Sequence, residues 1–200
     1  MALFTNLCIR LFFVLTPFFA LTMFLALTEG YSEQRRRRLA LVVSFAAAVI
    51  CVVLLFAGKQ MFLVFGITLD SFRIGAGVLL LLSGIGLVHG KSVAANAPPG
   101  GDVAIVPLAI PIIVGPATTG TLLVTGAELI TLSAKAVGCA ALLLAVMCVA
   151  AVLLAGSAIQ RILGVRGISI LSRLTGLILA ALAAQMIMTG VQGFLGIQVQ

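Results

Sequence analysis

The stretch Pro107-Leu-Ala-Ile-Pro111-Ile-Ile-Val-Gly115-Pro116-Ala-Thr-Thr-Gly120-Thr121 is an apolar segment interrupted by three prolines. It lies within Val103–Ala127, a run without a charged residue that is long enough to cross a membrane. Proline, however, removes a backbone donor and clashes with the preceding helical turn. In lipid, the freed backbone groups need partners inside the protein or in a water-lined cavity. The stretch therefore predicts a broken membrane helix that lines something polar.

The composition of the whole chain also indicates a bilayer environment. Its 200 residues are 62% hydrophobic and 8% charged, and the mean hydropathy is +1.33. The charge-free runs have lengths that suit membrane helices, and they do not alternate as the strands of a transmembrane barrel do. We predict an all-α, polytopic membrane protein whose second and fifth spans are continuous helices. The six predicted spans are Leu11–Thr28, Leu39–Gly58, Ile74–Val88, Val103–Ala127, Ala136–Gln160 and Leu174–Gln200.

The basic residues predict the orientation, because loops rich in lysine and arginine stay in the cytoplasm. Arg35–Arg38 follow the first span and place the N-terminus outside. Six spans then put both termini on the outer side. The net charge of +7 mostly reflects this asymmetry, and the chain has too little soluble surface for a nucleic-acid partner. The predicted inner side carries Arg35–Arg38, Lys91, Arg161, Arg166 and Arg173, and the outer side carries Arg10, Lys59, Arg73 and Lys135.

A proline- and glycine-rich linker at 98–100 divides one membrane domain, 1–200, into halves 1–97 and 101–200. The halves resemble each other weakly, either because they are copies of one unit or because apolar segments are similar by chance. If they are copies, three spans per half require the second half to enter the membrane from the opposite side. This predicts a 3+3 inverted repeat, as in many secondary transporters, with the first and fourth helices broken at proline. The matching segments are Thr16-Pro17 with Gly115-Pro116, and Gly66–Leu69 before Arg73 with Gly167–Ile170 before Arg173.

The sequence offers little for catalysis. It has one histidine, and its acids are Glu29, Glu33, Asp70, Asp102 and Glu128, all at predicted span ends or in loops. It contains no GxSxG, HExxH or P-loop motif, and its four cysteines form no CxxC pair. We expect the protein not to be an enzyme and to use neither a metal nor a cofactor.

With catalytic and metal-binding groups excluded, the neutral polar groups around the broken helices are the candidates for lining a solute path. A half-helix that begins after Gly115-Pro116 would turn unpaired N–H groups and its positive end toward an anionic group. Alternatively, the prolines and threonines only shape the helices. Gln185 is expected either to clamp two helices or to line the cavity. The candidate path residues are Thr16, Pro17, Pro107, Pro111, Gly115, Pro116, Thr118, Thr119, Thr121 and Gln185.

Two arginines begin the third and sixth spans from opposite faces of the membrane. Arg73 and Arg173 either snorkel to the interface or act as gate charges, each closing one side of the path. Asp70 lies three residues before Arg73, at helical pairing distance. Glycines of the third span and alanines of the sixth give each of these helices a small face, which predicts close packing against other helices.

Several of these segments resemble the signature of the MarC family of bacterial inner-membrane proteins, and the similarity runs from about Phe13 to Gly190. The resemblance implies about six spans in the bacterial inner membrane and, from a few members, transport of neutral amino acids. The segments that carry it are Val106–Pro111 with Gly115-Pro116; Phe65–Ile67 with Phe72–Gly75 and Gly77; and Gly167-Ile168 with Ser172–Leu174 and Gly176.

The hypothesis that follows is a transporter of a small polar or zwitterionic solute, such as a neutral amino acid. Its expected partners are the lipid bilayer and the solute, and a homo-oligomer is possible. Arginines on both faces leave a second hypothesis open, a translocase for lipids or lipid-linked precursors. A third is a non-transporting scaffold, which would have a solidly packed centre and threonines bonded to their own helices.

Overall fold

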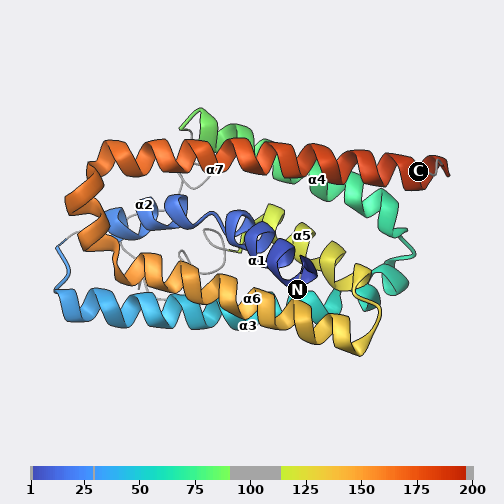
Figure 1. The fold of residues 1–200 in the computed structure, drawn as a ribbon, viewed down its shortest axis with the longest axis horizontal. Helices are drawn as coiled ribbons and strands as arrows, with labels where there is room; N and C mark the ends of the chain where they lie inside the picture. Colours follow the sequence, from blue (N-terminus) through green and yellow to red (C-terminus); the bar gives the residue numbers. More distant parts are fainter. Residues whose placement is uncertain (1, 29, 91–113, 197–200) are drawn as a thin grey trace.

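The computed structural model describes residues 2–28, 30–90 and 114–196, and over these ranges the chain is helical and has no strand. The helices lie roughly along one axis (Figure 1). The α2–α3 and α6–α7 connections lie at one end of the bundle, and the α3–α4 and α5–α6 connections at the other. The helices are α1 (Ala2–Val14), α2 (Pro17–Leu27), α3 (Glu33–Phe65), α4 (Leu69–Val88), α5 (Pro116–Glu128), α6 (Leu132–Leu154) and α7 (Gly156–Leu195).

Five stretches of the described residues are long and apolar enough to cross a membrane. They overlap the predicted first, second, third, fifth and sixth spans. The first half of the predicted fourth span, with Pro107 and Pro111, lies outside the described residues, as does the linker at 98–100. Helix α5 is the described second half of that span. The five stretches are Leu3–Leu27, Glu33–Gly58, Leu69–Val88, Leu132–Leu154 and Gly156–Leu195.

Two of the helices begin at a proline. Leu15 and Thr16 separate α1 from α2, and Thr16 has φ 48° and ψ 57°, a left-handed conformation that no other described non-glycine residue adopts. Pro17 then occupies the first position of α2. Pro116 likewise begins α5, after an extended Gly115. Proline suits this position because its missing N–H would have no partner in the first helical turn.

The predicted continuous helix over Ala136–Gln160 is wrong. Helix α6 ends at Leu154, and α7 begins at Gly156. Helix α7 is itself bent at Gly164, whose φ of 65° and ψ of 172° suit glycine almost alone. The break at Ala155 coincides with neither a charge nor a proline, so the hydropathy of the run does not reveal it.

Helix α4 packs antiparallel to α7 through small residues, so the small-residue faces predicted on these two spans meet each other. A Cβ added to Gly77 would lie 3.2 Å from the Ala183 carbonyl oxygen, and one added to Gly84 would lie 2.8 Å from the Gly176 carbonyl oxygen. The backbones therefore approach as closely as small-residue packing in membranes allows.

Helix α5 is held equally tightly against α3. A Cβ added to Gly126 would collide with the Leu55 carbonyl oxygen, and one added to Gly58 would collide with the carbonyl oxygen of Leu123. On its other side, a Cβ on Gly120 would lie 2.7 Å from the Cβ of Ala76 in α4. Helix α5 is thus fixed between α3 and α4.

We expect Gly126→Ala to destabilise the fold by about 1–3 kcal/mol, because the added methyl group forces α3 and α5 apart. Gly75→Ala is the matched control, since a Cβ there meets nothing within 4 Å. Thermal unfolding of the purified protein in detergent measures the difference. Equal unfolding temperatures for the two variants would contradict the close contact.

Candidate functional site

The two proline breaks lie against each other. The hydroxyl of Thr118, in the first turn of α5, donates a hydrogen bond of 3.2 Å to the carbonyl oxygen of Val14, the last residue of α1. Val14 and Ala117 also belong to one buried apolar cluster, with Leu80, Leu179 and Ala183. The structure therefore brings together the regions around Thr16-Pro17 and Gly115-Pro116 that the sequence singled out.

The threonines at this meeting point bond to the backbone. Thr121 donates to the Ala117 carbonyl at 2.9 Å, and Thr125 donates to the Thr121 carbonyl at 2.8 Å. Both side chains bond within their own helix, so they fit the alternative in which threonines shape helices. Thr119 is half-buried. None of the predicted path residues that the structure describes lines either of the two pockets described below.

Gln185 does not occupy the position predicted for it. Its side chain is exposed on α7, whereas Ala183 and Ile187 of the same helix contact Gly77 of α4. Two residues along a helix correspond to a rotation of about 200°, so Gln185 faces away from α4. The prediction of a buried amide that clamps helices of this chain or lines its cavity is wrong.

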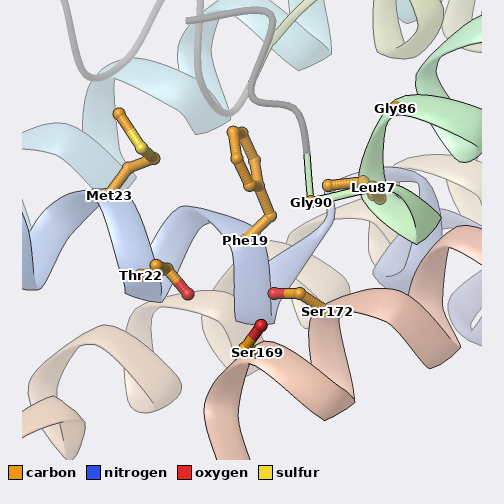
Figure 2. Close-up of a pocket in the computed structure, with 8 residues that line it drawn as sticks. All are labelled: Phe19, Thr22, Met23, Gly86, Leu87, Gly90, Ser169 and Ser172. Atoms are coloured by element: carbon orange, nitrogen blue, oxygen red, sulfur yellow. The ribbon is translucent and has the colours of Figure 1, made fainter. Parts of the chain in front are cut away.

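A pocket of about 130 Å³ lies between α2, α4 and α7 (Figure 2). Its wall has an apolar part, with Phe19 and Leu87, and a polar part made of hydroxyls. Figure 2 shows the hydroxyls of Thr22, Ser169 and Ser172 turned toward one another. The lining residues are Phe19, Thr22, Met23, Gly86, Leu87, Gly90, Ser169 and Ser172.

Ser172 provides the most informative group of this pocket. The residue is only 8% exposed, and its buried hydroxyl has no hydrogen-bond partner among the residues that the structure describes. The hydroxyl of Thr22, by contrast, donates to the Phe18 carbonyl at 2.9 Å. Because a buried hydroxyl without a partner costs about 1–3 kcal/mol, Ser172 marks a place where a polar ligand group would be favourable.

A second pocket, of about 470 Å³, shares Thr22 with the first and extends to the α2–α3 connection at Gly30. The bend at Gly164 lies between two of its lining residues, Gln160 and Val165, and shapes this wall. The complete lining is Thr22, Leu25, Ala26, Gly30, Arg36, Gln160, Val165 and Ile168.

Arg36 supplies the positive charge of the second pocket. Its guanidinium donates to the Ser157 hydroxyl at 2.8 Å and to the Thr28 carbonyl at 3.1 Å, so it ties α3 to the end of α2 and the start of α7. Glu33 lies 3.7 Å from the same guanidinium. The buried Nε–H of Arg36 has no acceptor in the described part of the chain. The group therefore retains hydrogen-bonding capacity for an additional acceptor.

The opposite end of the bundle carries an ion-pair triad. Arg73 at the start of α4 lies 2.6 Å from Asp70 and 2.9 Å from Glu128 at the end of α5. The predicted pairing of Asp70 with Arg73 is confirmed, and Glu128 is a partner that the sequence did not reveal. Arg173 is exposed and has no carboxylate partner among the described residues. The triad joins α4 to α5 at the predicted outer end.

The described residues contain no group of three or more side chains that could hold a metal ion.

The chain matches the family described as MarC family integral membrane protein over residues 1–195. The protein belongs to the MarC family. The resemblance found in its motifs is thereby confirmed, and the chain is an integral, multi-pass membrane protein.

Its relatives are membrane proteins from bacteria and archaea. A UPF0056 membrane protein of Methanocaldococcus jannaschii is 35% identical over 193 residues, which cover 92% of this chain and 94% of the relative. The UPF0056 inner membrane protein YhgN of Escherichia coli is 33% identical, with 81% of this chain and 83% of the relative covered. No solved structure matches the chain.

We expect Thr118→Val to destabilise the protein by about 1–3 kcal/mol, because it removes a donor from the Val14 carbonyl at the break of α1. Thr121→Val is the control and should cost less, since it removes only a bond within α5. Thermal unfolding in detergent compares the two. A larger effect at Thr121 would contradict the importance of the contact between the breaks.

Proposed function

We propose that the protein transports a small polar or zwitterionic solute, such as a neutral amino acid, along a route that includes both pockets. The observation that carries this proposal is the unpaired, buried hydroxyl of Ser172 in the wall of a pocket between three helices. A polar solute bound in this pocket would give the hydroxyl the partner that it lacks among the described residues.

The chemistry of the two pockets fits a zwitterion. Arg36 in the larger pocket is suited to a carboxylate, because a guanidinium binds carboxylates with charge-assisted hydrogen bonds. The hydroxyls of Ser169 and Ser172 in the smaller pocket can accept from an ammonium group. The remaining lining is largely apolar and leaves room for a short side chain.

An inverted repeat, part of the same proposal, is supported by matched local features. Pro17 and Pro116 both begin a helix after a break. Ser32 and Thr131, also 99 residues apart, are both N-caps whose hydroxyls accept a hydrogen bond from the N–H three residues later. These matches favour two copies of one three-span unit, with α2 corresponding to α5.

The two ends of the bundle differ in a way that fits alternating access. At the predicted outer end, the Arg73–Asp70–Glu128 triad and the glycine contacts of α5 fill the space. The counterpart helix α2 borders both pockets, and the larger one reaches the predicted inner end. In the proposed cycle, the conformation described is closed at the outer end, and an exchange of packing between the halves would reverse it.

A second candidate function, a non-transporting scaffold, is favoured by the threonines of α5. Thr121 and Thr125 bond to their own helix and are completely buried or nearly so. Uptake of labelled amino acids into liposomes containing the purified protein separates the two functions. A transporter should give uptake above that of empty liposomes. If no amino acid of a broad panel is taken up above this background, the scaffold function is favoured.

Ser172→Ala should weaken solute binding about 2- to 10-fold, because one hydrogen bond to the solute is lost. The matched control is Ser83→Ala, since Ser83 lies in a span but donates to the Leu79 carbonyl and lines neither pocket. Concentration-dependent uptake into liposomes gives the half-saturation constant of each variant. An unchanged constant for Ser172→Ala would remove Ser172 from the route.

Arg73→Gln and Glu128→Gln should each slow solute exchange about 2- to 5-fold, because each weakens the partly exposed ion pair that closes the outer end. The double variant should be no slower than the slower single variant, since both changes break one contact. Arg161→Gln, an exposed arginine outside the triad, is the control. If the reductions in exchange rate caused by the two single changes add in the double variant, Arg73 and Glu128 do not act as one gate.

A further inference from the structure

The exposed amide of Gln185 lies well inside α7, one of the candidate membrane spans. Its neighbours in sequence, Ala183 and Ile187, contact Gly77 near the centre of α4. Gln185 is therefore level with the central part of two candidate spans. Its side chain makes no hydrogen bond to the described residues, and its backbone carbonyl accepts from the Thr189 hydroxyl.

An unpaired amide facing hydrocarbon is unfavourable, because neither its N–H groups nor its carbonyl find partners in lipid. The adjacent surface of α7 is also unlike a lipid-facing surface. Ala181 and Ala184 flank Gln185 and are both exposed. Small residues of this kind allow another helix to approach closely.

The exposed surface of α3 provides an internal comparison. Its exposed residues between Leu41 and Phe56 are all large and apolar, as expected for contact with lipid chains. They are Leu41, Val42, Phe45, Val49, Val53 and Phe56, each at least 39% exposed. The part of α7 that is level with the centre of α4, by contrast, includes two alanines and an amide among its exposed residues.

The spacing of the exposed residues on α7 fits a helix pair. Leu174, Ile178, Ala181, Gln185 and Met188 are separated by alternating steps of four and three residues, the heptad spacing of a left-handed helix pair. Gln185 then occupies one of the two seam positions of the heptad. A single polar residue at such a position fixes the register and the number of strands.

We propose that α7 is a homodimer interface in which Gln185 of one copy pairs with Gln185 of a second copy. Two copies inserted in the same orientation are related by a twofold axis along the membrane normal, so that their α7 helices run parallel. Each residue of the seam then meets its own counterpart. The amide is self-complementary, because its N–H groups donate to the carbonyl oxygen of the other copy.

Disulfide cross-linking in liposomes tests the geometry. In a background with Cys8, Cys51, Cys139 and Cys148 replaced by alanine, Gln185→Cys and Met188→Cys should form covalent dimers on oxidation. Val49→Cys on the exposed surface of α3 is the matched control and should not. Cross-linking at α7 no greater than at position 49 would overturn the proposal.

A second measurement uses the protein with its own cysteines. Energy transfer between differently tagged copies in liposomes measures the protein density at which half of the copies are dimeric. For Gln185→Leu this density should be roughly 3- to 20-fold higher than for the unchanged protein, because a hydrogen bond between membrane helices is lost. Gln185→Asn should retain most of the association, because it keeps the amide. Association of Gln185→Leu equal to that of the unchanged protein would overturn the proposal.

Discussion

The pairing of backbone groups within the protein is the constraint on which the rest of the structure depends. A broken helix in lipid leaves carbonyls and N–H groups that no water can satisfy. At the end of α1, the Val14 carbonyl accepts from the Thr118 hydroxyl, and this bond places the start of α5 beside the break. The glycines of α5 then allow its backbone to approach α3 and α4 closely. The positions of three helices thus follow from one interrupted span.

Features that depend on a few neighbouring residues could be predicted from the sequence. The ranges of the described spans follow from runs of apolar residues, and the helix starts at Pro17 and Pro116 follow from the chemistry of proline. The Asp70–Arg73 pair follows from helical spacing. In each case the interaction lies within one helix or at its end, so no knowledge of the tertiary arrangement is required.

Features that depend on how helices face one another could not be predicted. Gln185 has no charged neighbour or turn signal that reveals which side of α7 is covered, and the structure exposes it. Glu128 pairs with Arg73, which lies 55 residues earlier in the sequence. The pocket hydroxyls were also missed, although Ser169 lies in the Gly167–Ile170 segment and Thr22 corresponds to Thr121 at a distance of 99 residues.

The correspondence between Thr22 and Thr121 shows why the pockets lie where they do. Both hydroxyls donate to the carbonyl four residues earlier, at 2.9 Å. Thr121 is nevertheless completely buried, whereas Thr22 lines both pockets. The difference arises from packing, because glycines bring α5 into backbone contact with α3, while α2 borders open space beside α7. Under the proposed function this is the required arrangement, since locally equivalent helices must be enclosed on one side of the membrane while they are accessible on the other.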